Sequence, residues 1–334
     1  MTKTNTAASI AFENLDQDPD IAGNFLQSEK WMEVNRLVGH RVIKKTFRDK
    51  YTVYMIIKDA RRGRYLEIPG GPLINWTDKK LVAEVFAEIK NVAQAENCVF
   101  VRFRPQLLDT PKNRELLEMQ DAKISPMHLH APHTVIIDLS PDEETLLANM
   151  RRQTRYEVRR SAKQNLKVEK GTEKELYNEF HAVQVKTAER QHFIPPSDKD
   201  LLSERKAFGD DAVIYVAKTE DGEPVAYGLF LKHGVEADYF EAASTDLNRK
   251  FSGAYALQWQ AIRDFKAEGY KRYNLWGIAP PNSPNHRYAG VTTFKTGFGG
   301  ENVTFIPAHD IIINKVRYLK DYFIETARKK VRKL

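Results

Sequence analysis

The chain has 334 residues, of which 42% are hydrophobic and 29% charged, with a single cysteine. At about 100–200 residues per domain this length predicts two domains, and the apolar fraction argues against a disordered chain. One cysteine excludes an internal disulfide and any zinc site that needs two thiolates, and no apolar run approaches the ~20 residues that cross a bilayer. A cytoplasmic, reduced, globular protein is expected. The net charge of +7 favours anionic partners such as RNA, phosphates or an acidic membrane face, and it fits an ordinary basic protein equally well.

The first part of the chain predicts a leader followed by a helix–strand–helix–strand unit. Residues 1–20 are polar and Ala-rich without an apolar core, so a mobile leader is expected there and a secretory signal is not. The elements predicted next are a helix over 21–38, strands over 51–57 and 64–68, an amphipathic helix opening at 75–78 and a buried strand over 98–103. Residues 105–133 are expected to form loops.

From Thr134 onward the same order of elements returns in a fuller form. The sequence predicts a strand over 134–139, helices over 140–163 and 173–190, strands over 212–217, 224–231 and 237–242, a helix opening at Ser252-Gly253, a strand over 273–276 and a last helix over 316–331. Mixed sheets flanked by helices fit this order, so the expected class is α/β. An architectural duplication is a hypothesis, because no sequence repeat is visible.

A basic helical stretch is the first candidate site. Arg151, Arg155 and Arg159 are spaced by four and share a helix face, with Tyr156 among them as a stacking surface. Guanidinium groups on one face repel each other unless an anion neutralises them, and their shape suits phosphate. A solvated basic helix explains the same pattern equally well.

A lysine followed by glycines is the second candidate, in the run Tyr288–Gly300. Lys295 stands where the glycines would let the backbone approach a ligand, and a partly desolvated ammonium can stabilise an oxyanion or hold a phosphate. Phe294 and Phe298 beside it are expected to pack in the core. The pattern alone is common in loops.

Three other features are weaker. The helix start at Ser252-Gly253 has the small residues that pyrophosphate-binding helix ends use, and a plain helix start explains it as well. His128, His130 and His133 have no nearby Asp, Glu or Cys, so no metal site is expected. Cys98 is expected in the core.

Six motifs occur in an order that resembles the FemABX peptidyltransferase family, from about residue 25 to 330. They are Ile137–Ser140 leading into Leu147–Lys163, Glu241–Asp246, Gly253–Ile262, Tyr273–Gly277 and Gly290–Gly300, with Gln27-Ser28, Trp31 and Gly70–Pro72 in the N-terminal half. The resemblance implies two GNAT-like acyltransferase domains side by side, over 21–133 and 134–311, with a C-terminal helix over 312–334 packed on the first. Only Gln164–Gly171 lies where FemA-like members insert a helical arm, so a compact FemX-like member is implied.

The resemblance also implies a reaction. The family transfers an amino acid from aminoacyl-tRNA to an amine of the peptidoglycan precursor stem peptide, carried by UDP-MurNAc-pentapeptide or lipid II. No cofactor is implied, and a monomer is expected. The basic tail Arg328–Lys333 would suit an acidic membrane face, although a solvated helix end explains it better. Two alternatives stay open: an N-acyltransferase that uses acyl-CoA or aminoacyl-tRNA on another amine, and a non-enzymatic RNA- or membrane-binding protein.

The resemblance assigns roles to particular residues. Lys295 matches the family lysine that stabilises charge near the tRNA end, which makes it the expected catalytic residue. An attacking amine forms a tetrahedral oxyanion on the ester, so orientation and an oxyanion stabiliser are needed. The proton route stays open. The three arginines of the basic helix are candidates for tRNA phosphates: Arg151, Arg155 and Arg159.

Several positions expected to bind substrate depart from the family pattern. Asn35 stands where relatives often have a lysine, Arg104 replaces an acid, and Glu241 replaces a tyrosine. Pro195 stands at a family arginine, with Lys199 as a substitute charge. The remaining expected substrate contacts follow the pattern: Trp31, Tyr239 and Phe294. The departures put the identity of the acceptor in doubt more than the type of reaction.

Overall fold

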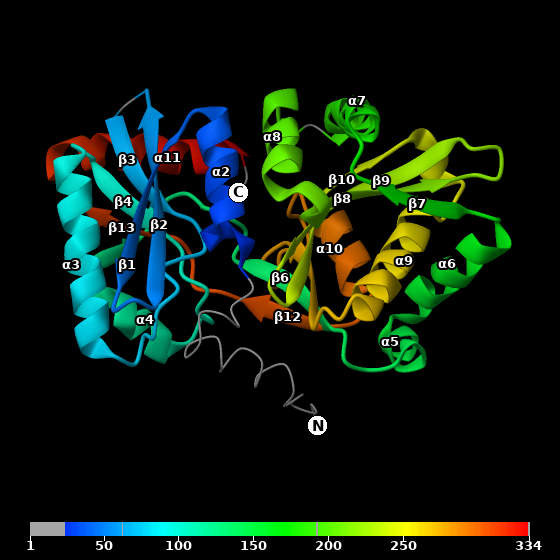
Figure 1. The fold of residues 1–334 in the computed structure, drawn as a ribbon, viewed down its shortest axis with the longest axis horizontal. Coiled ribbons are helices and arrows are strands. Elements are labelled where there is room, and N and C mark those ends of the chain that lie inside the picture. The colour runs from blue at the N-terminus through cyan, green and yellow to red at the C-terminus, as the bar shows by residue number, and fades with distance from the viewer. Residues whose placement is uncertain (1–23, 62, 192, 333–334) are drawn as a thin grey trace. The chain divides into compact units, whose positions relative to one another are not determined.

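The computed structural model describes residues 24–61, 63–191 and 193–332, with the side chains of 328–332 left aside (Figure 1). The leader predicted over 1–20 lies outside the described residues. The chain divides into two compact units. The described residues of 1–134, 277–289 and 303–334 form the first, and 135–276 with 290–302 form the second. The domain boundaries expected from the sequence placed 277–289 and 303–311 in the second domain, whereas in the structure both segments belong to the first unit.

The first unit begins with a short 3-10 turn and a helix. The helix predicted over 21–38 is interrupted at Ser28, whose hydroxyl donates to the carbonyl of Phe25 and accepts from the N–H of Trp31. Ser28 thereby caps the second piece and ends the first. The elements are η2 (Phe25–Gln27), α2 (Glu29–Val38), β1 (Arg41–Phe47), β2 (Tyr51–Ala60), β3 (Gly63–Ile68), α3 (Lys79–Ala95), β4 (Phe100–Phe103), α4 (Pro111–Glu118) and β5 (Ala122–Ile124).

The chain returns to this unit at its C-terminal end through β13 (His309–Ile312) and α11 (Lys315–Arg332). The described strands form a sheet in the order β1-β2-β3-β4-β13-β5. β13 pairs antiparallel with both β4 and β5, and these ladders bring residues near 309 into the first unit. Tyr318 of α11 packs edge-on against Phe100 of β4 and donates its hydroxyl hydrogen to Asp310.

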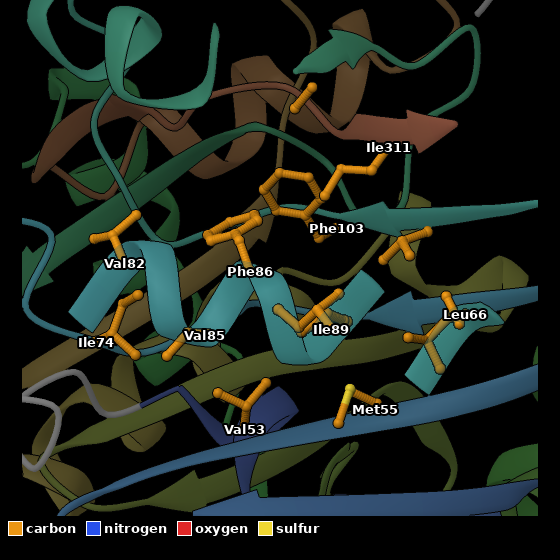
Figure 2. Packing of buried hydrophobic residues seen from close by; sticks show 14 of the residues in the cluster. Val53, Met55, Leu66, Ile74, Val82, Val85, Phe86, Ile89, Phe103 and Ile311 are labelled. Atoms are coloured by element: carbon orange, nitrogen blue, oxygen red, sulfur yellow. The ribbon is translucent and has the colours of Figure 1, made fainter. Parts of the chain in front are cut away.

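The core of the first unit lies between α3 and the sheet. Figure 2 shows Val85, Phe86 and Ile89 of α3 facing Met55 of β2 and Phe103 of β4. All five are buried. The three residues of α3 repeat with helical spacing, and each buried side chain of this size contributes about 1.5–3 kcal/mol.

The second unit holds the larger sheet. Its elements are β6 (His133–Asp138), α5 (Glu143–Asn149), α6 (Arg152–Lys163), β7 (Lys167–Gly171), α7 (Lys174–Gln191), α8 (Asp198–Phe208), η3 (Gly209–Asp211), β8 (Ala212–Lys218), β9 (Pro224–His233), β10 (Glu236–Ser244), η4 (Asp246–Arg249), α9 (Gly253–Ala267), β11 (Arg272–Gly277), α10 (Ala289–Thr296) and β12 (Glu301–Thr304). The strand order is β12-β6-β11-β10-β9-β8-β7. Two mixed sheets with helices confirm the expected α/β class.

Three differences from the predicted elements affect the site. The helix predicted over 140–163 is two helices, because Met150 is extended and buried between them. The run predicted as a loop around Lys295 is the helix α10. Between α6 and α7 the chain forms β7, and these residues contain no helical arm. Among the described helices, none combines the length and apolarity needed to span a bilayer.

Candidate active site

Lys295 is a buried cation on α10 of the second unit. Its side chain is 8% exposed, and its Nζ lies 5.8 Å from the centre of the Tyr239 ring. Burial lowers the pKa of Lys295 to about 7, because a low-dielectric environment disfavours the charged amine. An ammonium held on an aromatic face keeps part of the attraction it loses from water. The group can therefore stabilise a nearby negative charge strongly.

Tyr239 of β10 is held in place by aromatic side chains of the two neighbouring strands. Its ring stacks on Phe230 of β9 with centroids 5.3 Å apart, and Tyr273 of β11 also packs against Phe230, with centroids 6.1 Å apart. Tyr273 donates its hydroxyl hydrogen to Gln258 of α9 at 2.5 Å. Burial raises the pKa of Tyr239, so its hydroxyl stays protonated at neutral pH. Lys295 and Tyr239, which the sequence named separately as site residues, thus lie together.

A β-bulge separates Tyr239 from Glu241. Tyr239 pairs with Phe230, but Glu241 pairs with the adjacent Leu229, so the register shifts by one residue. Residues two apart on a regular strand share a face, and the extra residue reverses this. Glu241 therefore turns toward α7, where the Gln184 amide donates to its carboxylate at 2.7 Å.

The partly buried Glu241 interacts with a second carboxyl group, that of Glu204, which the sequence did not reveal. Glu204 of α8 is 4% exposed, and its Oε2 has no hydrogen-bond partner among the described residues. Burial raises the pKa of Glu241 to about 7, with a further rise from Asp200, while the Gln184 hydrogen bond opposes it. Burial and the charge of Glu241 also raise the pKa of Glu204. Both carboxyl groups therefore take up a proton more readily than an exposed glutamate does.

Two of the glycines after Lys295 are required by close packing against other elements of the protein. A Cβ on Gly297 would lie 2.3 Å from Thr154 Oγ1, and one on Gly300 would lie 2.5 Å from the carbonyl oxygen of Ile136. The prediction that these glycines let a ligand approach the backbone is wrong, because α6 and β6 fill the space. Phe298 is buried as expected. Phe294 is partly exposed, with its ring against Tyr255 and Phe298.

The three predicted phosphate-binding arginines have different surroundings. Arg155 is occupied, because its guanidinium donates to the carbonyls of Ala148 and Met150 at the end of α5. Arg151 begins α6 with its N–H bonded to the carbonyl of Gly297 at 2.8 Å, and its side chain is exposed. Arg159 is also exposed. Binding of tRNA phosphates stays a prediction for Arg151 and Arg159, whereas Arg155 has a structural role.

Side chains of the protein already form hydrogen bonds with the residues at the start of α9. The N–H of Ser252 donates to Gln164, the N–H of Ala254 donates to Asn248, and the Ser252 hydroxyl donates to Glu157 at 2.6 Å. A helix start binds pyrophosphate through free N–H groups. The plain helix start is therefore the better explanation. Lys199, on α8, has an exposed side chain.

The first unit holds the other expected substrate residues. Asn35 is buried, and its Oδ1 accepts a hydrogen bond from Lys58 Nζ at 3.2 Å. Lys58 of β2 thus places an ammonium beside the position where relatives have a lysine. Trp31 packs edge-on against Phe25 with centroids 5.3 Å apart.

Arg104, at the end of β4, is a buried cation. It is 3% exposed and lies over the Phe305 ring at 5.5 Å. Its Nε and Nη1 have no hydrogen-bond partner in the described part of the chain, and burial lowers its pKa to about 10. Burial and the Arg104 charge lower the pKa of His130 to about 3, so this histidine is neutral. The described residues contain no group of three His, Cys, Asp or Glu that could hold a metal ion.

Comparison with known proteins agrees with the fold. Aminoacyltransferase FemA of Staphylococcus epidermidis is 32% identical over 103 residues, which are 30% of this chain and 25% of FemA. The match thus spans about a quarter of that relative. A structure described as FemX superposes with a TM-score of 0.81 at 17% identity, covering 96% of this chain and 99% of that one.

A tandem GNAT protein from the clavulanic acid pathway superposes with a TM-score of 0.52 at 9% identity, covering 82% and 83% of the two chains. These likenesses confirm the expected tandem GNAT-like fold. The model of the FemAB family matches residues 11–133, 126–223 and 215–326. With most of its length matched, the chain belongs to the FemAB family, as its motifs indicated.

Proposed function

We propose that this protein transfers an amino acid from aminoacyl-tRNA to an amine of the peptidoglycan precursor stem peptide. The observation that carries the proposal is the Lys295 ammonium, buried and held on the Tyr239 ring. Membership of the FemAB family and the relative named aminoacyltransferase support it. The acceptor is UDP-MurNAc-pentapeptide or lipid II, and the enzyme acts as a cytoplasmic monomer without a cofactor.

Lys295 acts on the oxyanion of this reaction. The acceptor amine attacks the ester carbonyl of the charged tRNA, the carbon–nitrogen bond forms, and the carbonyl oxygen becomes negative. The Lys295 ammonium donates a hydrogen bond to this oxygen, and the ester bond to the ribose then breaks. A single donor of this kind contributes about 100- to 1,000-fold to the rate. The Tyr239 ring keeps water from one side of the ammonium and so keeps its charge unscreened.

Glu241 is the proposed acceptor of the amine proton. A carboxyl group whose pKa is about 7 is partly ionised at neutral pH, and it is more basic than an ordinary glutamate. Because Glu241 faces α7 and Tyr239 does not, the proton that the attacking nitrogen gives up is proposed to reach this carboxylate through water, and the departing ribose oxygen takes up one proton. Burial keeps the pKa of Glu241 high, and the charge of Asp200 adds to this. Gln184 fixes the orientation of the carboxylate.

Two cations of the first unit, the buried Arg104 and the partly buried Lys58, are proposed to bind anionic groups of the acceptor. Both proposed acceptors carry a diphosphate and peptide carboxylates, and Arg104 and Lys58 offer cationic donors near Asn35 and Phe305. Trp31, Lys199 and Phe294 remain proposed substrate contacts. Arg151 and Arg159 are proposed to contact tRNA phosphates. The acyl-CoA alternative loses its main support, because side chains occupy the start of α9.

A transfer assay tests the proposal directly. Purified protein is given a pool of tRNAs charged with labelled amino acids and either UDP-MurNAc-pentapeptide or lipid II. Label should move to one acceptor, and Lys295→Ala should lose about 100- to 1,000-fold of the rate. Lys271→Ala is the matched control, since Lys271 is an exposed lysine of the same unit. No transfer to either acceptor, together with acyl-CoA binding by calorimetry, would overturn the proposal.

A further inference from the structure

The C-terminal helix α11 has an exposed apolar stripe opposite its packed face. Val316, Leu319 and Phe323 are 81%, 57% and 70% exposed. The packed face carries Tyr318, which contacts β4, and Glu325, which pairs with Arg102. At 3.6 residues per turn, the three exposed apolar side chains fall within an arc of about 60°. Three large apolar side chains gathered on one exposed arc mark an interaction surface.

Charge is arranged around this stripe in a definite way. Lys315 and Lys320 are exposed and lie about 40° beyond its two edges, from the same helical spacing. The acidic residues of α11 are Asp321 and Glu325, and both lie on the packed side, partly or fully buried. The sequence at the end of the helix, Arg328 to Lys333, adds further basic residues. The exposed side of the helix is therefore apolar along its middle and cationic at its edges.

We propose that α11 docks on an anionic membrane surface. Val316, Leu319 and Phe323 enter the boundary between headgroups and acyl chains, while Lys315 and Lys320 extend to the lipid phosphates. Helices with an apolar face and basic edges lie in the interface plane in this manner. A second copy of this chain is a poorer occupant, because it would bring the lysines of two helices together. The proposal extends the proposed function by supplying the membrane face that a lipid-linked acceptor needs.

Vesicle binding of the full chain tests this proposal. Vesicles of equal parts phosphatidylglycerol and phosphatidylcholine should sediment the protein, and vesicles of phosphatidylcholine alone should sediment much less. Phe323→Glu should weaken binding about 10- to 100-fold, the equivalent of burying one aromatic side chain. Met119→Glu, at another exposed apolar residue of the first unit, should leave it unchanged. Added salt should weaken binding because the lysines contribute through screened charge.

Three results would overturn the docking surface. They are equal binding to both vesicle types, binding that Phe323→Glu does not change, and a Phe323→Glu variant that alters only the oligomeric state in sedimentation velocity. The last result would assign the stripe to a second copy. Transfer to the soluble acceptor UDP-MurNAc-pentapeptide is measured in parallel with the same variants. It should stay at the wild-type rate, so failure of docking and failure of the transfer proposal are distinguished.

Discussion

Replacing Lys295 by methionine should stabilise the second unit and remove amino-acid transfer. Methionine is unbranched and flexible enough to fill the same space, and it has no charge to desolvate. Burial lowers the pKa of Lys295 from 10.5 to about 7. At about 1.36 kcal/mol per pKa unit, this shift lowers the free energy of unfolding by about 4 kcal/mol at pH 7. Attraction to the Tyr239 ring offsets about 0.5–2 kcal/mol, so the expected net gain is about 2–4 kcal/mol.

The gain should depend on pH in a stated direction. Unfolded Lys295 keeps its proton up to its ordinary pKa of 10.5, while the folded side chain releases it near 7. Between these values the unfolded state binds more protons, so the wild type becomes more stable as pH rises. The methionine variant has no such group. Its advantage should shrink by about 3 kcal/mol between pH 7 and about pH 9.5.

The difference in stability is measured by urea unfolding of both proteins at the two pH values, with amide hydrogen exchange of β10 and α9 as the probe. These elements report the second unit by itself. Lys271→Met, at an exposed lysine, should show neither the gain nor its pH dependence. A methionine variant less stable than the wild type at neutral pH would refute the reasoning. An advantage independent of pH would refute it too, because it would mean that the folded lysine keeps its proton.

Other predictions concern the proton acceptor, a glycine and an arginine. The pH profile of kcat/KM should be bell-shaped around pH 7, because the reaction needs the Glu241 carboxylate and the Lys295 ammonium. The variant Glu241→Gln should have a rate about 100- to 10,000-fold lower, and its pH profile should have no acidic limb. An acidic limb that persists contradicts this. Gly300→Ala should lower the free energy of unfolding by about 1–3 kcal/mol, because φ is +89° and a Cβ would lie 2.5 Å from a carbonyl oxygen; an unchanged urea midpoint would argue against it. Arg155→Met should speed hydrogen exchange in α5 and leave KM for charged tRNA unchanged, and the opposite pair of results would assign Arg155 to tRNA.

The fold could be predicted where the apolar period is clear, as in α3. It could not be predicted where tertiary contacts override the local pattern. Strand β1 has partly buried residues between the exposed Arg41, Lys44 and Thr46, so its apolar signal is weak. The break between α5 and α6 depends on the buried Met150 and on the bond from the Arg151 N–H to Gly297, far along the chain. Local sequence continues the helix through both residues, because nothing near them reports this contact.

The candidate site was predicted only in part, for a similar reason. The sequence named Lys295 and Tyr239 separately, and the contact between them is known only from the structure. Glu204 could not be found, because its burial follows from the packing of α8, a helix without a clear apolar period. Lys58 was not predicted either, because only the packing of α2 against β2 brings it to Asn35. Contacts between side chains of different helices and strands produce no local pattern in the sequence, so they cannot be predicted from spacing.

Burial acts on the two proposed reactive groups in opposite directions. It lowers the pKa of Lys295 and raises that of Glu241, and both arrive at about 7. With both values near 7, only about a quarter of the free protein carries the ammonium and the carboxylate together at neutral pH. An anionic group beside Lys295 would raise its pKa, and a cationic amine beside Glu241 would lower its pKa. Bound substrates would therefore bring both groups into their reactive forms, which makes the protonation of the site depend on its occupancy.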